Sequence, residues 1–128
     1  MFSSQPLKNQ TILVTRPKPQ ATELIRLIQQ HGGQAVVFPA LEICPVEHSP
    51  AQKQILENLK TYQWLIFVSV NAVNFAVTAN NGKIDQFKQI KIAAVGKATA
   101  KALENAGLSV DLVPETGFNS EALLKAPE

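Results

Sequence analysis

Residues 91–103 have the sequence Lys-Ile-Ala-Ala-Val-Gly-Lys-Ala-Thr-Ala-Lys-Ala-Leu. The apolar run Ile92–Val95 predicts a short strand that is buried on both faces, as in parallel sheets. Gly96 ends this strand, and the alanine-rich segment after it predicts a helix that begins almost at once. A strand that turns directly into a helix leaves unpaired N–H groups beside the positive end of the helix dipole. The stretch therefore predicts a strand–helix turn that can hold an anion.

The size and composition of the chain limit its class. Its 128 residues suffice for one substantial core but are few for two complete domains. A net charge of +2 gives no strong basic field, so we expect no nucleic-acid partner. The single cysteine, Cys44, excludes an intrachain disulfide, and no apolar run has the length of a membrane span. We therefore expect a cytoplasmic protein without membrane contact.

Strand and helix patterns alternate along the chain. Each predicted strand is a short apolar run, and each predicted helix has apolar residues at helical spacing. The predicted strands are Thr11–Thr15, Ala35–Phe38, Trp64–Ser69, Ile92–Val95 and Val110–Val113. The predicted helices begin near Ala21, Pro50, Asn71, Ala98 and Ser120. This alternation predicts an α/β fold with a parallel sheet and right-handed crossovers.

Residues 39–48 have a different character from the segments on either side. Between two prolines, apolar and polar residues alternate in the order Ala-Leu-Glu-Ile-Cys-Pro-Val-Glu. This pattern predicts an exposed, extended connector, which could be one half of a two-stranded linker between domains.

The candidate functional residues follow the predicted strands. In open parallel sheets, ligands bind beyond the carboxyl ends of the strands. The candidates at these ends are Thr15, Arg16, Ser69, Val70, Asn71, Gly96, Lys97, Thr99 and Asn119. They supply hydroxyl and amide groups, backbone N–H groups and two cations, but no carboxylate and no histidine.

This donor set excludes several functional classes. A phosphoacceptor receiver domain needs an acidic cluster at the strand ends to hold a divalent metal. Ser69 lacks the G-x-S-x-G context of a hydrolase nucleophile, and Gly96 alone is not the G-x-G-x-x-G of a dinucleotide site. His31, His48 and Cys44 lack any recognised metal-ligand spacing, so no metal site is predicted.

Each polar candidate also has an ordinary structural alternative. Ser69 and Thr99 could each cap a helix through the side-chain hydroxyl. Arg16 and Lys97 could be solvated surface charges, which is the commoner fate of such residues. The residues by themselves leave both alternatives open.

Several segments together carry a resemblance to a known family. They are Ile12–Pro17, Pro39–Ile43, Trp64–Ser69, Asn71–Val73, Ala94–Ala100, Val110–Pro114 and Ser120–Leu124. Each segment is weakly specific by itself. In this order and at this spacing over nearly the whole chain, the segments together resemble those of the uroporphyrinogen-III synthase family. Val68 departs from the pattern, because threonine is common in the family at this position.

The resemblance implies an architecture. Members of the family have two flavodoxin-like α/β domains, joined by a two-stranded ladder, with the substrate in the cleft between them. By that pattern, residues 1–39 form the first β-α-β unit of domain one, residues 40–48 the interdomain connector, and residues 49–128 the first part of domain two. The chain would then be truncated, with half-domains that make up about half of the family's full length.

The resemblance also implies a reaction. The family cyclises hydroxymethylbilane, an anionic linear tetrapyrrole, to uroporphyrinogen III, with inversion of the last pyrrole ring, loss of water and no cofactor. Thr99 would be the catalytic candidate, and the other strand-end residues would bind substrate carboxylates. On this view we expect the 128-residue chain to be inactive by itself. A non-catalytic α/β module that binds an anionic small molecule, or a structural domain, remains an alternative.

The partial sheets raise a question of association. The resemblance implies a monomeric full-length protein, whereas two- and three-stranded pieces would leave unpaired strand edges. The first β-α-β unit could dock on the rest of the same chain, or it could exchange with a second copy about residues 39–48. We favour exchange or another tight homodimer.

Overall fold

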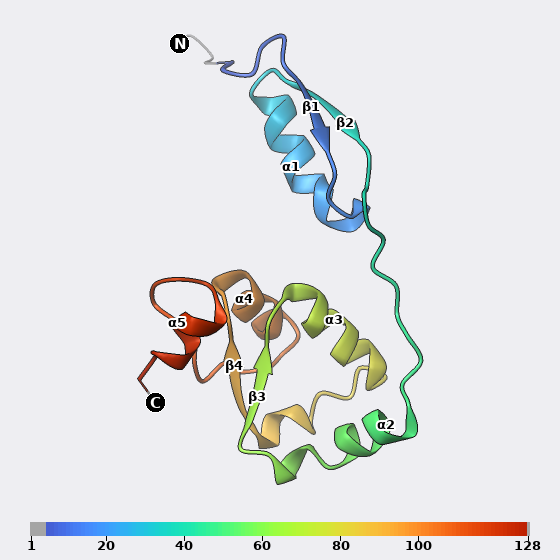
Figure 1. Cartoon of the computed structure of the whole chain (residues 1–128), viewed down its shortest axis with the longest axis vertical. Coiled ribbons are helices and arrows are strands. Elements are labelled where there is room, and N and C mark those ends of the chain that lie inside the picture. The colour runs from blue at the N-terminus through green and yellow to red at the C-terminus, as the bar shows by residue number, and fades with distance from the viewer. Residues whose placement is uncertain (1–4, 128) are drawn as a thin grey trace. The chain divides into compact units, whose positions relative to one another are not determined.

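The computed structural model describes residues 5–127 and divides the chain into two compact units, Met1–Val46 and Glu47–Glu128 (Figure 1). Each unit has its own cluster of buried apolar side chains. Within the described part of the chain, no helix is both long and apolar enough to cross a membrane. The assignment of residues 1–39, 40–48 and 49–128 to parts of two domains stays a prediction.

The first unit is one parallel β-α-β motif. Strand β1 (Thr11–Val14) pairs in register with β2 (Gln34–Val37), and helix α1 (Lys18–Gln30) connects them (Figure 1). Val14, Ala21 and Ile28 form its small buried core. The sequence prediction of a parallel β-α-β unit is confirmed. The helix begins three residues before the predicted Ala21, because its first turn accommodates proline without losing a hydrogen bond.

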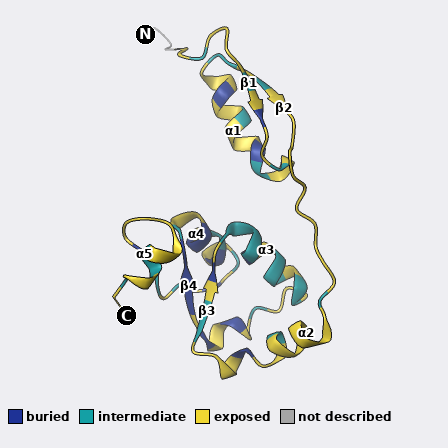
Figure 2. Ribbon diagram, viewed as in Figure 1, coloured by how far each residue is buried: buried dark blue, intermediate teal, exposed yellow. Residues whose placement is uncertain are grey.

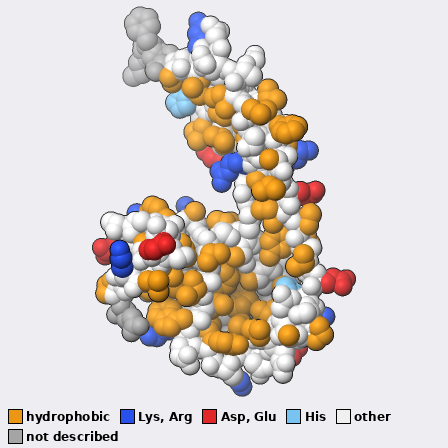
Figure 3. All heavy atoms as spheres, viewed as in Figure 1, with side chains coloured by type: hydrophobic (Ala, Val, Ile, Leu, Met, Phe, Trp, Pro, Cys, Tyr) orange, Lys and Arg blue, Asp and Glu red, His pale blue; other side chains and the backbone are white. Residues whose placement is uncertain are grey.

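One part of this first unit presents apolar side chains to solvent. Leu13 on β1, its register partner Val36 on β2, and Phe38, two residues after Val36, are all exposed and follow the same face of the sheet. Hydrophobic side chains accordingly appear at the surface of this unit in Figure 3. The sheet has two strands, so the outer backbone edges of β1 and β2 carry no further strand among the described residues. Such edges and faces favour association.

We expect the 128-residue chain to self-associate through this exposed apolar surface. Sedimentation velocity over a wide concentration range should show conversion of monomer to dimer. Val36→Lys combined with Phe38→Lys should shift the equilibrium to monomer, because burying two charges at the contact is costly. Leu124→Lys, at an exposed leucine of the second unit, serves as the control. A single monomeric species at every concentration would contradict self-association.

The second unit begins with a helix that is stabilised mainly at its own start. Residues 39–48 have no helix or strand, and α2 (Pro50–Glu57) follows them. The Ser49 hydroxyl accepts the Gln52 N–H, and the Gln52 side chain accepts the Ser49 N–H, which makes a complete capping box. Serine before proline predicts such a cap, and this prediction is confirmed. The helical spacing of Ile55, Leu56 and Leu59 predicts a buried stripe, which is wrong for Ile55: this residue is exposed, because α2 buries none of its side chains.

The core of the second unit forms around a second parallel strand pair. Strand β3 (Trp64–Phe67) pairs with β4 (Lys91–Ala94), and the helices α3 (Val70–Ala79) and α4 (Lys97–Asn105) follow them. Two short 3-10 helices, Leu59–Thr61 and Phe87–Gln89, precede the strands. Burial is concentrated in β4 and α4, whereas α2 and α5 are largely exposed (Figure 2). Phe67 and Phe87 meet edge to face with ring centroids 6.5 Å apart.

The predicted strand Val110–Val113 is wrong. Only Leu112 bridges to Ala93, in parallel orientation, and the segment does not extend into a ladder. The Asp111 carboxylate accepts a hydrogen bond from the Ile92 N–H at 2.7 Å. In a regular strand pair, a backbone carbonyl would accept this hydrogen bond. The N–H groups of Asp111 and Leu112 both donate to the Ile92 carbonyl. Because the Asp111 side chain takes the place of a backbone acceptor, and because Pro114 has no N–H to donate, the pairing is limited to one bridge. The last helix, α5 (Ser120–Leu124), is present as predicted.

We expect Asp111→Ala to lower the free energy of unfolding by about 1–3 kcal/mol, because the buried Ile92 N–H loses its acceptor. Asp111→Asn keeps a side-chain oxygen and should cost less. Urea denaturation followed by Trp64 fluorescence measures both. Glu115→Ala, at an exposed position of the following loop, is the control. Equal stability of Asp111→Ala and this control would show that the bridge does not depend on the carboxylate.

Candidate functional site

The β3–β4 ladder places the starts of two helices side by side, beyond the carboxyl ends of the two strands. This end of the strand pair, with the first turns of α3 and α4, is called the β3–β4 edge. Phe67 is in register with Ala94 at the ends of the strands, and Val95 N–H still donates to the Phe67 carbonyl at 3.1 Å. Ser69 and Gly96 each lie two residues beyond this last registered pair, and each is the N-cap of the helix that follows. The turns that the sequence identified after these strands therefore occupy neighbouring positions.

The α3 start is closed by its own cap. The Ser69 hydroxyl accepts the Ala72 N–H at 3.1 Å, which is the structural alternative expected for an isolated serine. Val70 and Asn71 form the first turn of this helix and are half-buried. Ser69 thus satisfies one of the free helix donors, and its hydroxyl proton is still available for a second hydrogen bond.

The α4 start has no such cap. Gly96 occupies the N-cap position in extended backbone geometry and has no side chain to accept a hydrogen bond. Ala100 N–H bonds to the Gly96 carbonyl, whereas the N–H groups of Lys97, Ala98 and Thr99 find no acceptor among residues 5–127. These donors and the helix dipole make a positive backbone site at the sheet edge.

Thr99 does not cap this helix. Its hydroxyl makes no hydrogen bond within the described part of the chain, although the residue is only 5% exposed. No side-chain oxygen or nitrogen among the described residues is both fully buried and unpartnered, so the Thr99 hydroxyl oxygen retains contact with solvent. Helical side chains lean toward the N-terminus, so the Thr99 side chain lies over the first turn of α4. The burial also shows that Thr99 contributes more packing than a residue lining an open cleft would.

The loop before α5 completes the edge. Gly117 has a φ of +74°, and a Cβ there would lie 3.0 Å from Ala122 Cβ, so this position requires glycine. The Asn119 carboxamide oxygen accepts the Ala122 N–H at 2.9 Å and caps α5. Between them, Phe118 lies over Gly96, where an added Cβ would be 3.6 Å from Phe118 Cβ. The sequence predicts a loop over residues 114–118, which includes Phe118, but a lone phenylalanine has no motif that would give it a role.

Thr15 and Arg16 belong to the first unit. Both are exposed and follow the carboxyl end of β1, as predicted. The Thr15 carbonyl accepts the Ala40 N–H at 3.0 Å, which holds the chain as it leaves the motif. The side chains of both residues are thus presented at the end of a strand.

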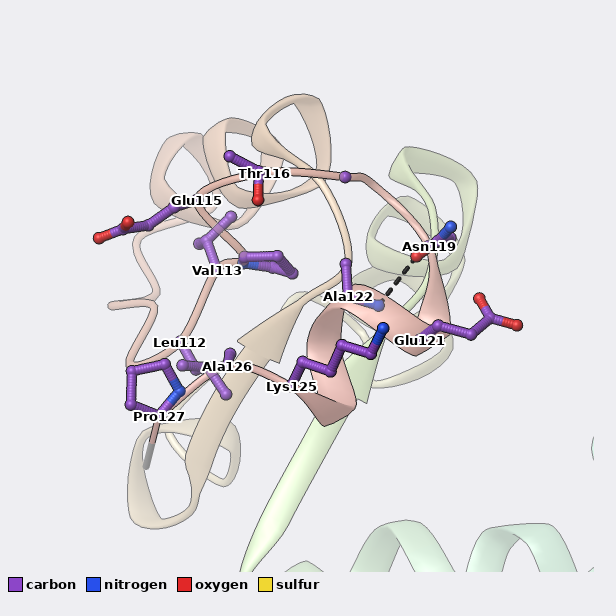
Figure 4. A pocket seen from close by; sticks show the side chains of 12 residues that line it. Leu112, Val113, Glu115, Thr116, Asn119, Glu121, Ala122, Lys125, Ala126 and Pro127 are labelled. Carbon is purple, nitrogen blue, oxygen red and sulfur yellow. Dashed lines mark hydrogen bonds between the residues drawn. The ribbon is translucent and has the colours of Figure 1, made fainter.

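A separate hollow of about 620 Å³ lies between α5 and the loop after Leu112 (Figure 4). Glu115 and Glu121 point away from it, and much of its lining is apolar. The described residues contain no group of three or more histidine, cysteine, aspartate or glutamate side chains that could hold a metal ion.

The second unit is a parallel α/β unit with free helix N–H groups at its strand ends, the arrangement at which open α/β sheets commonly bind anions. Comparison with family models identifies the class more closely. The model described as uroporphyrinogen-III synthase HemD matches residues 22–127. The chain belongs to the uroporphyrinogen-III synthase family.

Curated relatives agree with this assignment. The chain is 36% identical over 110 residues to the uroporphyrinogen-III synthase of Chlorobaculum parvum, covering 82% of this chain and 42% of that protein. It is 32% identical over 119 residues to the Escherichia coli uroporphyrinogen-III synthase, covering 92% and 48%. A porphyrin biosynthesis protein HemD from Ruminiclostridium josui is 34% identical over 117 residues, or 89% of this chain and 23% of that protein.

The chain spans less than half the length of these three relatives. Among solved structures, Thermus thermophilus uroporphyrinogen III synthase matches with a TM-score of 0.49 and 21% identity, over 89% of this chain and 46% of that one. The parallel α/β architecture itself is seen directly in the two strand pairs. The assignment of these units as flavodoxin-like half-domains stays a prediction.

The two helix starts should respond differently to loss of a hydroxyl. We expect Ser69→Ala to lower the free energy of unfolding by about 0.5–2 kcal/mol, because the Ala72 N–H loses its cap. Ser69→Asn should retain most of the stability, since asparagine also caps. Ser109→Ala, in an exposed loop, is the control. If thermal and urea unfolding of Ser69→Ala match those of the control, the cap has no energetic importance.

Proposed function

We propose that the protein to which this chain belongs is a uroporphyrinogen-III synthase, a cyclising hydro-lyase of tetrapyrrole biosynthesis. It would close hydroxymethylbilane to uroporphyrinogen III, with inversion of the last pyrrole ring and loss of water. The observation that carries the proposal is the family match over residues 22–127, which includes both helix starts of the β3–β4 edge. The small-molecule substrate is the proposed partner, and a cytoplasmic location is proposed with it.

The donor set of the edge suits such a substrate. Hydroxymethylbilane carries eight carboxylates, and charge-assisted hydrogen bonds from N–H and hydroxyl groups are strong. Gly96 and Lys97, with the free N–H groups of the α4 start, would bind one carboxylate. Ser69, Val70 and Asn71 would bind at the neighbouring α3 start. Thr15, Arg16 and Asn119 are further proposed contacts.

Catalysis in this proposal is mainly a matter of orientation. Loss of the terminal hydroxyl gives a reactive azafulvene, which also cyclises spontaneously without inversion to the type I isomer. The enzyme would hold the rings so that attack at the substituted carbon of the last ring is favoured. The Thr99 hydroxyl, which has no partner within residues 5–127, would assist departure of the substrate hydroxyl.

The isomer ratio tests the proposal. The product of the complete gene, incubated with freshly prepared hydroxymethylbilane, should give an excess of uroporphyrinogen III on chromatographic separation. Residues 1–128 alone should give only the spontaneous type I product, because they span less than half the length of the relatives. Type I product without an excess of type III from the complete protein would refute the proposed function. Excess type III product from residues 1–128 would refute only their inactivity.

Thr99→Val removes the hydroxyl and keeps the packing volume of this buried residue. We expect turnover by the complete protein to fall roughly 10- to 100-fold, with little change in melting temperature. Thr99→Ser is the matched variant: it keeps the hydroxyl, loses a buried methyl group, and should lower stability more than turnover. Unchanged turnover in Thr99→Val would assign the residue to packing alone.

A further inference from the structure

Phe118 combines a fixed position with an exposed side chain. The residue is 59% exposed and does not belong to the buried cluster of the second unit. The loop nevertheless holds it closely, between the left-handed turn at Gly117 and the Asn119 cap of α5. Its Cβ, Cγ and Cδ1 atoms lie directly over Gly96, at the start of α4. A large apolar side chain left in water gains nothing from burial, so its ring is available for a contact with a ligand.

The groups around Phe118 attract anions. Lys97 Nζ lies 5.9 Å from the centroid of the Phe118 ring, within range of a cation–π contact. The free N–H groups of the α4 start belong to the three residues that directly follow Gly96, the residue that Phe118 contacts. Thr99, nine-tenths buried and without a hydrogen-bond partner in the described chain, adds an unused hydroxyl in the same first turn. The Thr99 hydroxyl is a donor separate from the backbone N–H groups and is open to a further hydrogen bond.

We propose that Phe118 and Lys97 form a subsite for one carboxylate-bearing pyrrole ring. This inference rests on the proposed function and specifies which residues of the edge hold a ring. The Phe118 ring stacks against the flat pyrrole, and Lys97 with the α4 N–H groups binds a carboxylate on that pyrrole. Stacking fixes the plane of the ring, which N–H donors alone do not. Phe118 is therefore a positioning residue in this model of the site.

Kinetics of Phe118 variants in the complete protein test the subsite. Phe118→Ala should raise KM for hydroxymethylbilane roughly 3- to 10-fold, as expected for loss of an aromatic contact. Phe118→Leu keeps apolar packing on Gly96 but has no flat face, so it should raise KM by a similar factor. Phe118→Trp should keep KM near the wild-type value. Tyr62→Ala, at an exposed aromatic residue before the amino end of β3, is the matched control.

The comparison of leucine with tryptophan separates stacking from packing. If Phe118→Leu keeps the wild-type KM in an active enzyme, the residue only packs the loop, and the subsite is refuted while the proposed function stands. If the wild-type protein makes no type III product, the proposed function fails, and binding of porphobilinogen decides the subsite. Millimolar porphobilinogen, a pyrrole with two carboxylates, should then shift the amide NMR signals of residues 97 and 118 in wild type, and a roughly 3- to 10-fold higher concentration should be needed for the same shifts in Phe118→Leu. Absence of these shifts in the wild type would overturn the subsite.

Discussion

The parallel register of β3 and β4 is the constraint on which the second unit depends. Because Phe67 pairs with Ala94, the chain leaves both strands at the same level and begins two helices there. A slip by one residue would turn each side chain of a strand to the opposite face. It would expose Phe67, which now meets Phe87, and would move Gly96 away from Ser69. The buried face and the arrangement of the site thus follow from the same pairing.

Features set by neighbouring residues could be predicted from the sequence. The strand ending at Ala94, the helix after Gly96 and the caps at Ser49, Ser69 and Asn119 each depend on residues within a few positions. Short apolar runs, Pro after Ser, and Gly after a strand are local signals with a direct physical cause. The family resemblance, which the family match bears out, rests on the order of the same local pieces.

Features set by distant residues could not be predicted in this way. Val110–Val113 has the composition of a strand, but a hydrogen bond between residues 19 positions apart, from Ile92 to Asp111, replaces the ladder. The burial of Thr99 likewise depends on how α4 packs, which periodicity alone does not give. Phe118 was placed in the correct loop, yet only its contact over Gly96 distinguishes it from an ordinary surface phenylalanine.

The glycine cap of α4 has a consequence for how the site can change during evolution. The free donors after Gly96 are backbone N–H groups, which every residue except proline supplies. An anion held there would be held by atoms that ordinary side-chain substitution does not remove. Relatives that share about a third of their residues with this chain could therefore keep the same contact while the side chains around it diverge. Alanine scanning would overlook such a contact, whereas proline substitution or replacement of the amide by an ester would reveal it.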